Sequence, residues 1–288
     1  FDSDVYALWR HGPEMERECR SLDDIPLTSG ADLLLYHLSI GYQEMHDWLM
    51  LREEPLAISY HNVTPSSFYR AHNPEFADDL DLGFSPSRLV EEPYDPHLLA
   101  SMNSRYPNGY VVAVGQVLPH KRIEQLMQTM HLLNSTFWGN IGLVICGVQR
   151  QHGYFQSLLR YRSRCAMVDV HFAGAVSDRE LATYVRGASA YLGMSDHEGF
   201  CIPPLEAAAM GVPVVIKGAG AIPESIGQGA LLLPADAGPV LAAEAVNEVL
   251  TNAAVRHTLI SRGHQRAREL QEQSHVQETI RLIAEVVG

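Results

Sequence analysis

The stretch "YVVAVGQVLPHKRIEQLMQTMHLLNSTFWGNIGLVICG", residues 110–147, decides the fold class. Its two ends, residues 110–115 and 141–147, are short continuous apolar runs of the kind found in fully buried strands. Between them, residues 123–133 place apolar side chains at helical spacing. A buried strand, a helix and a second buried strand make the repeating unit of a parallel sheet covered by helices.

The same alternation continues along the second half of the chain. Further strands are expected at residues 168–174, 190–195 and 213–218, and helices at residues 154–165, 177–188 and 204–211. Ser177 and Glu180 have the spacing of a capping box at the start of one helix, and Gly211 ends another. From Val240 onward the pattern is helical almost throughout. The second half is therefore predicted to be a Rossmann-like domain.

The first half shows a thinner pattern of the same kind. Residues 31–41 and 55–62 are predicted as strands, and residues 42–51 as a helix between them. Residues 79–100 run from an acidic stretch into a Pro-rich turn and are expected to hold almost no helix. Because of this join, and because the chain starts at Phe1, we expect segments of the natural protein to be missing from the first half.

Pro107 and Gly109 separate the two periodic regions, so a domain boundary is predicted there. The predicted division is an N-terminal Rossmann-like domain, a C-terminal Rossmann-like domain and a C-terminal helix that packs back on the first domain. These parts cover residues 1–107, 108–268 and 269–288.

The composition limits the classes of partner. Of the 288 residues, 46% are hydrophobic and 19% charged, and the formal net charge is -13. Such an acidic balance argues against nucleic acid, which needs clustered Lys and Arg. No apolar run is long enough to cross a bilayer, and no signal-peptide pattern follows Phe1. A cytoplasmic protein without a transmembrane segment is therefore expected.

The four cysteines form neither a CxxC pair nor a metal-ligand spacing. They are Cys19, Cys146, Cys165 and Cys201. We expect all of them to be reduced and buried, as small apolar side chains.

Residues 195–213, "SDHEGFCIPPLEAAAMGVP", follow a predicted strand and open a helix. In open parallel sheets, ligands bind beyond the carboxyl ends of the strands, which is where this loop lies. Pro203 and Pro204 suit the first turn of a helix. The backbone amides of Gly199, Phe200 and Cys201 can then point at an anion such as a diphosphate.

Two carboxylates, Glu198 and Glu206, flank this predicted anion site. Since carboxylates repel phosphate, they are better suited to accept hydrogen bonds from hydroxyl groups at the two ends of a nucleotide sugar. The simpler interpretation of Glu206 is a favourable negative charge near a helix N-terminus.

The stretch "EGFCIPPLE", residues 198–206, with the following "AAAMGVPVV", resembles the E-x7-E signature of glycosyltransferase family 4, whose members are retaining enzymes of the GT-B fold. The resemblance extends over residues 112–127, 168–195 and 220–234, and is weaker in the first half, in "AISYHN" and "GFSPSRL". It implies an α/β protein with two Rossmann-like domains facing across a cleft, each with a mostly parallel sheet.

The resemblance also implies roles for individual residues. Glu206 would bind the ribose hydroxyls, and Glu198 the donor sugar. Lys121, in "GQVLPHK", matches the family's lysine that supports the departing phosphate, and His61 matches a histidine that faces the donor sugar. Taken alone, Lys121 would be a solvated surface lysine and His61 a satisfied loop histidine.

Further matches concern the rest of the donor. The amides of Gly199, Phe200 and Cys201 would lie along the diphosphate, and the backbone near Gly174 to Val176 would hold the base.

One departure from the family pattern concerns positive charge. The family usually has arginine where this chain has Gln116, so one charge partner of the diphosphate is missing. Whether the neighbouring Arg122, where glycine is common, compensates is left open.

The chemistry implied is metal-independent sugar transfer from a nucleotide diphosphate, first of all a UDP-sugar. Lys121 and the helix N-terminus would stabilise the departing negative charge. The DxD pairs Asp2/Asp4 and Asp79/Asp81 lack convincing neighbouring ligands, so no metal and no cofactor are expected. Retention implies same-face attack with the leaving phosphate accepting the proton, and a covalent intermediate stays open.

The acceptor would be a hydroxyl of a saccharide, a lipid or a natural product. Three alternatives remain: a sugar-nucleotide epimerase on the same fold, a non-catalytic nucleotide-sugar-binding homologue, and a nicotinamide-dependent dehydrogenase. The last rests on "GAGAIP", residues 218–223, where Pro223 replaces the third glycine of the dinucleotide fingerprint.

Overall fold

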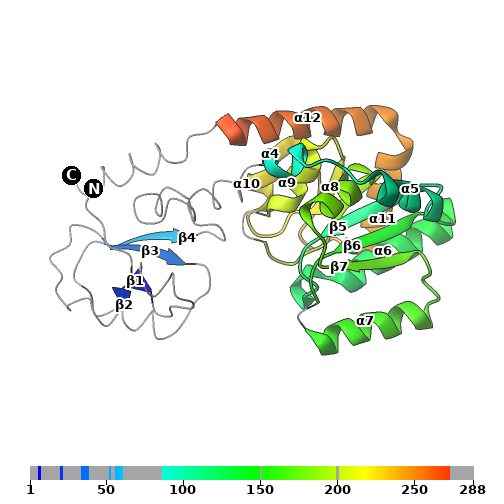
Figure 1. The fold of residues 1–288 in the computed structure, drawn as a ribbon, viewed down its shortest axis with the longest axis horizontal. Helices are drawn as coiled ribbons and strands as arrows, with labels where there is room; N and C mark the ends of the chain where they lie inside the picture. Colours follow the sequence, from blue (N-terminus) through cyan, green and yellow to red (C-terminus); the bar gives the residue numbers. More distant parts are fainter. Residues whose placement is uncertain are drawn as a thin grey trace. The chain divides into compact units, whose positions relative to one another are not determined.

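The five strands predicted for the second half, together with a sixth that was not predicted, β10, form one parallel six-stranded sheet in the computed structural model (Figure 1). In chain order they are β5 (Tyr110–Val114), β6 (Gly142–Cys146), β7 (Val170–Gly174), β8 (Ala190–Gly193), β9 (Val214–Lys217) and β10 (Leu231–Leu233). Their order across the sheet is β10-β9-β8-β5-β6-β7. The first of these strands is therefore central, and the order reverses beside it, as in a doubly wound Rossmann-like sheet.

The structure describes residues 86–149, 151–198 and 201–272, together with Arg52 and four strands nearer the N-terminus. These strands are β1 (Tyr6–Ala7), β2 (Arg20–Ser21), β3 (Leu34–Leu38) and β4 (Leu56–Tyr60). β3 and β4 pair in parallel and confirm the two strands predicted in the first half. The helix predicted at residues 42–51 lies outside the described residues.

Helices and short helical turns precede, connect or follow the strands of the sheet. They are α4 (Pro86–Glu91), α5 (Pro96–Arg105), η3 (Pro119–Lys121), α6 (Ile123–Leu133), η4 (Asn134–Trp138), α7 (His152–Arg164), α8 (Asp178–Arg186), α9 (Ile202–Ala209), α10 (Ile222–Ile226), η5 (Gly227–Gly229), α11 (Pro239–Thr251) and α12 (Ala253–Glu272). The helical pattern predicted after Val240 is thus confirmed as far as Glu272, where the described residues end.

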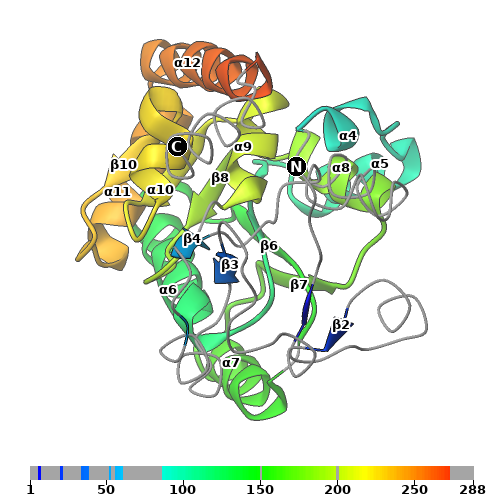
Figure 2. The same cartoon turned by 90° about the vertical axis from the view of Figure 1, so that its left-hand side faces the viewer.

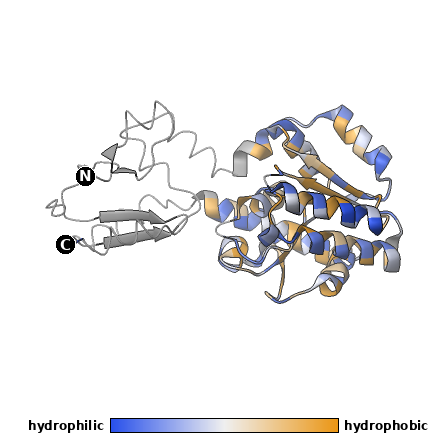
Figure 3. Cartoon of the chain, turned by 90° about the horizontal axis from the view of Figure 1, so that it is seen from below, coloured by the Kyte–Doolittle hydropathy of each residue, from blue (hydrophilic) through white to orange (hydrophobic). Residues whose placement is uncertain are grey.

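Each face of the sheet has its own apolar core. Val111 and Ala113 point to the face that α6, α7 and α11 cover, whereas Val112 points to the face that α5, α8 and α9 cover. Figure 1 and Figure 2 show α6 and α7 on one side of the sheet and α8 and α9 on the other. Because both faces are covered, the strands are apolar throughout, as the colouring of Figure 3 shows.

The burial of these strands supplies the main stabilisation of the domain. Leu143, Val144 and Ile145 in β6 are each at most 1% exposed. Burying an aliphatic side chain of this size contributes about 1.5 to 3 kcal/mol. The continuous apolar runs that predict the strands are therefore the same residues that hold the layers together.

Residues 79–100 depart from the prediction, because the described part of this stretch contains α4 and the start of α5. Asp95 caps α5 by accepting hydrogen bonds from the backbone amides of His97 and Leu98, and Pro96 occupies the first helical position. An N-cap aspartate followed by proline is a local start signal for a helix, and the expectation of almost no helix was wrong.

The division of the chain also differs from the predicted boundary at residues 107/108. The two compact units are residues 1–84 with 274–288, and residues 85–273. Residues 85–107 belong to the second unit because α4 packs on α8 and α9 and α5 packs on α8. The prediction that residues 269–288 pack back on the first domain concerns a segment of which residues 273–288 lie outside the described part of the chain.

The predicted burial of the cysteines holds for Cys146, which is buried. Cys165 and Cys201 are only half-buried, so the prediction was wrong for them, and Cys19 lies outside the described residues. All three described cysteines are free thiols.

The capping box predicted at the start of α8 is confirmed. The Glu180 backbone amide donates to the Ser177 hydroxyl, and the Glu180 carboxylate accepts from the Ser177 backbone amide at 2.8 Å. We expect Ser177→Ala to lower the free energy of unfolding by about 1 kcal/mol, measured by urea denaturation. The matched control is Ser157→Ala, because the Ser157 hydroxyl lies inside α7 and bonds the Gly153 carbonyl. Equal stability of both variants would contradict the capping role.

Candidate functional site

The carboxyl ends of β5 and β8 form the edge where the strand order reverses. α6, which follows β5, packs on one face of the sheet, and α9, which follows β8, packs on the other. Neither helix therefore closes over the end of these two neighbouring strands, which is where open α/β sheets bind ligands. A pocket opens here, and the residues of its polar lining include Gln116, Lys121, Ser195, Glu198 and Cys201.

Lys121 and Glu198 meet across this pocket. The Lys121 Nζ atom lies 2.5 Å from Glu198 Oε1, and the Ser195 hydroxyl donates to the same oxygen at 2.6 Å. Cys201 lines the same pocket, and burial raises the pKa of its thiol well above its usual range. The side chains of Lys121 and Glu198 are 21% and 10% exposed. A pair so shielded from water interacts more strongly than a surface salt bridge.

The two loops that carry this pair are joined to each other. Lys121 ends the short turn η3, which Pro119 begins. The backbone amide of Asp196, in the loop after β8, donates to the carbonyl of His120 at 2.8 Å. This main-chain hydrogen bond ties the β5 loop to the β8 loop directly beside the pair.

The loop after β8 enters α9 through a strained residue. Cys201 is the N-cap of α9 and has φ 58° and ψ 73°, in the left-handed region that non-glycine residues rarely adopt. Pro203 and Pro204 stand in the first turn, as predicted, and Gly211 follows the end of the helix with φ 76°. Gly199 and Phe200, predicted to line an anion, lie outside the described residues.

Glu206 lies on α9, apart from the residues that line the pocket. Burial, with a smaller contribution from the negative charge of Asp178, raises the pKa of Glu206 to about 7. Among the described residues, no side chain or backbone group donates a hydrogen bond to its carboxyl group. Asp178 begins α8, the helix that follows Gly174 and Val176.

Gly174 and Val176 follow the carboxyl end of β7. Gly174 has φ 77°, and its carbonyl accepts a hydrogen bond from the amide of Gly147 at 2.8 Å. Val176 packs against the core of the α8 and α9 face. The loop that was predicted to hold a base is thus anchored next to the end of β6.

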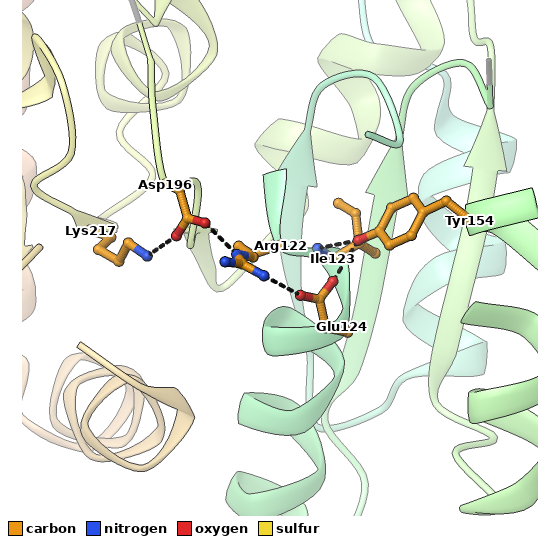
Figure 4. A network of polar contacts seen from close by, with 6 residues as sticks. All are labelled: Arg122, Ile123, Glu124, Tyr154, Asp196 and Lys217. Carbon is orange, nitrogen blue, oxygen red and sulfur yellow. Dashed lines mark hydrogen bonds and ion pairs between the residues drawn. The ribbon is translucent and has the colours of Figure 1, made fainter. Parts of the chain in front are cut away.

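Gln116 stands where the family usually has arginine, and the nearby Arg122 is held by ion pairs. Gln116 is exposed at the edge of the pocket. Arg122 adopts the left-handed conformation with φ 50° and binds Asp196 and Glu124 (Figure 4). In the structure, two carboxylates therefore pair with the guanidinium group of Arg122.

A second set of ion pairs runs from Lys217 through Asp196 and Arg122 to Glu124 (Figure 4). Asp196 binds Arg122 on one side and Lys217 Nζ, at 2.6 Å, on the other. The hydrogen bond from Lys217 is the largest cause that holds the pKa of Asp196 below its usual value. On the far side of Arg122, Glu124 accepts a hydrogen bond from the Tyr154 hydroxyl at 2.5 Å.

The structure thus brings Gln116, Lys121, Glu198 and Cys201 together in one pocket, whereas Glu206, Gly174 and Val176 are not among the residues that line it. His61, predicted to face a donor sugar, lies outside the described residues. Within residues 86–272, apart from the few positions not described, there is no cluster of three or more metal-ligating side chains.

Sequence reasoning missed Ser195, Asp196 and Lys217. Ser195 and Asp196 lie in the same short loop as Glu198, and that proximity was a signal for them. Lys217 carries no such signal, because its contact with Asp196 depends on β9 lying next to β8.

Residues 101–266, more than half of the chain, match the family model for "Glycosyl transferases group 1". The chain belongs to this family. The match begins within α5 and ends within α12, so it covers the whole six-stranded sheet and both loops of the pocket.

Curated relatives of this chain are similar over part of their length. The chain is 28% identical over 163 residues to the MMP alpha-(1->4)-mannosyltransferase of Mycolicibacterium hassiacum, a match that covers 54% of this chain and 38% of that protein. It is 31% identical over 128 residues to the O-antigen chain mannosyltransferase RfbU of Salmonella typhimurium, covering 44% and 35%. The matched regions thus span little more than a third of these relatives.

Solved structures show the fold. The sucrose-phosphate synthase of Thermosynechococcus elongatus is 18% identical and superposes with a TM-score of 0.60, covering 89% of this chain and 74% of that one. The Anabaena protein HepE, solved in complex with UDP and glucose, is 16% identical with a TM-score of 0.58, covering 86% and 77%. The chain has the GT-B fold of these enzymes.

None of the helices in the described residues is both long enough and apolar enough to cross a bilayer.

The raised pKa of Glu206 makes the stability of the domain depend on pH. Its ordinary value is near 4.5 and its folded value about 7, so the folded chain holds more protons than the unfolded chain between these values. Stability attributable to this group therefore falls as pH rises from about 4.5 to 7 and stays low above that range. We expect Glu206→Gln to raise the free energy of unfolding by about 1 to 3 kcal/mol at pH 8 and to have little effect near pH 4.5.

The measurement is urea denaturation of wild type and variant across this pH range. Glu244→Gln is the matched control, since Glu244 is exposed on α11 and its replacement makes the same change in net charge. A gain for Glu206→Gln that does not change with pH would contradict the prediction.

Proposed function

We propose that this chain is the donor-binding part of a retaining glycosyltransferase of family 4, which moves a sugar from a nucleotide diphosphate to an acceptor hydroxyl without a metal. The observation that carries the proposal is the Lys121–Glu198 pair at the point where the strand order reverses. A cation and a hydrogen-bond acceptor side by side are what a phosphate and an adjoining sugar hydroxyl require.

The proposed reaction breaks the bond between the anomeric carbon and the oxygen of the β-phosphate. The electron pair of that bond stays on the phosphate oxygen, where the ammonium group of Lys121 stabilises the charge. The acceptor oxygen bonds the anomeric carbon on the face that the phosphate leaves, and its proton passes to the departing phosphate. Glu198 holds a hydroxyl of the sugar, and His61, which lies outside the described residues, is proposed to bind the same sugar.

Glu206 is proposed to bind the ribose of the nucleotide. Its carboxyl group has no hydrogen-bond donor among the described residues and lies on the side of Asp178, which begins the helix after Gly174 and Val176. The backbone near Gly174 to Val176 would then hold the base. The amides of Gly199, Phe200 and Cys201 are proposed to lie along the diphosphate between the two acids.

The donor proposed first is a UDP-sugar, with a saccharide, lipid or natural-product hydroxyl as acceptor. HepE was solved with UDP and glucose, whereas the curated relatives are named mannosyltransferases, so mannose is the second candidate for the sugar. No cofactor is proposed, because the nucleotide sugar is itself the substrate.

Three competing functions predict different results. A sugar-nucleotide epimerase would change the donor without any acceptor, and a non-catalytic binding protein would release no nucleoside diphosphate. The dehydrogenase interpretation is disfavoured by the structure, because "GAGAIP" follows β9, the fifth of the six strands in chain order, and not the first strand of the sheet.

The proposal is tested first by a thermal-shift screen of nucleoside diphosphates and their glucose and mannose derivatives with the 288-residue chain. A ligand that binds only the folded state raises the melting temperature. We expect Glu206→Ala to remove most of the shift given by the preferred nucleoside diphosphate, whereas Glu244→Ala keeps it. Undiminished nucleotide affinity in Glu206→Ala would refute the ribose assignment.

Measurements of turnover test whether Lys121 stabilises the negative charge of the departing phosphate. We expect Lys121→Ala to lower kcat by about 100- to 1000-fold in the presence of EDTA, since it removes the cation that stabilises the departing oxygen. Arg160→Ala is the control, because it removes an equal charge from the exposed surface of α7. The product's anomeric configuration, read by NMR, tests retention. Activity that disappears with EDTA in the wild type would contradict the metal-independent reaction.

A further inference from the structure

The stretch "GAGAIP" has a place in the site that the dinucleotide interpretation does not explain. It begins directly after Lys217, the last residue of β9, and ends in the first turn of α10. β9 lies next to β8, so this turn runs beside the loop that carries Glu198. The backbone amide of Ala221 donates to the carbonyl of Glu198 at 3.1 Å.

Gly220 packs directly on the main chain of Glu198. A Cβ atom at residue 220 would lie 2.3 Å from the Glu198 carbonyl oxygen and 3.1 Å from its backbone nitrogen. Contacts below 3.0 Å with backbone atoms cannot be relieved by rotating a side chain. Gly220 also has φ 61°, in the left-handed region. Any larger residue here must therefore push the Glu198 backbone away.

Lys217 binds the same loop at Asp196, two residues before Glu198. Its Nζ atom lies 2.6 Å from Asp196 Oδ1, and the residue is only 4% exposed. The 288-residue sequence contains only two lysines, Lys121 and Lys217, and each binds a carboxylate of this loop. A buried ammonium group that has lost its water needs such a partner, so the loop is fixed where Lys217 ends β9.

We propose that the segment Lys217–Ala221 positions Glu198 for catalysis, with Gly220 setting the distance and Lys217 holding the loop through Asp196. The proposal rests on the proposed function, in which Glu198 binds the donor sugar. Neither Gly220 nor Lys217 needs to touch the substrate; both act through the main chain around Glu198.

The contacts of Glu198 divide between its two ends. Lys121 and Ser195 bind the carboxylate, while Gly220 and Ala221 hold the backbone. A backbone displacement therefore moves the carboxylate out of reach of a sugar hydroxyl without touching the nucleotide side of the site at Glu206. Misplacement by about 1 Å can cost on the order of 100-fold in rate.

The experiment compares Gly220→Ala with Gly139→Ala in the full chain. Gly139 also has a positive φ, 87°, but a Cβ atom there meets nothing within 4 Å, so this control carries backbone strain without a clash. The probes are UDP-glucose, GDP-mannose, UDP and GDP. We expect Gly220→Ala to lower kcat at least about tenfold relative to Gly139→Ala, with a smaller loss of affinity for the nucleoside diphosphate alone than for the sugar nucleotide.

The outcomes separate this proposal from the proposed function. Equal kcat in the two variants, or equal losses of nucleoside diphosphate and sugar-nucleotide affinity in Gly220→Ala, would overturn the positioning role. A wild-type chain that binds a sugar nucleotide without transferring it contradicts the proposed function only. In that case the ratio of sugar-nucleotide to nucleoside diphosphate affinity still tests Gly220. A wild type that binds neither contradicts both.

A second pair of variants applies if Gly220→Ala does not fold. We expect Lys217→Met to lower kcat in the same selective way, because it removes the ammonium group that holds Asp196. Lys217→Arg should restore much of the rate, since its guanidinium group can bind the same carboxylate. Full activity of Lys217→Met, or no rescue by Lys217→Arg, would count against the positioning role.

Discussion

The reversal of strand order between β5 and β8 is the constraint on which the rest of the site depends. Right-handed crossovers send α6 to one face of the sheet and α9 to the other, because their strands lie on opposite sides of this point. The ends of two neighbouring strands are thereby left uncovered. Only there can a loop from residues 115–122 meet a loop from residues 194–201, and Lys121 meets Glu198 as a consequence.

Charges at this edge are paired among themselves before any ligand arrives. Glu198 binds Lys121, and Asp196 is held between Arg122 and Lys217. In each pair the two partners come from the ends of different strands, so the pairs cross-link three strand ends. Main-chain hydrogen bonds from Asp196 to His120 and from Ala221 to Glu198 join the same loops. Partly buried ions would be costly alone, and their mutual compensation lets the site keep them in place.

The sequence predicts the parts of this structure that are local. Continuous apolar runs give the strands, and the spacing of Ser177 and Glu180 gives a confirmed capping box. Asp95 and Pro96 form a similar helix start signal that was not used, so α5 was not predicted. The approach of Gly220 to Glu198 could not be predicted, because a contact across 22 residues depends on which strands are neighbours and at what height their loops turn.

The two acids of the signature end in unlike surroundings, and their different environments argue for different tasks. Glu198 receives hydrogen bonds from two side chains, and Gly220 packs on its backbone, so its carboxylate is fixed in direction. Glu206 has a carboxyl group that burial makes easier to protonate and that has no donor among the described residues. A group left without donors gains most from hydroxyl groups that a ligand brings. The two acids therefore differ in role. Glu198 is an acceptor whose position the protein fixes, and Glu206 is an acceptor whose hydrogen bonds the ligand supplies.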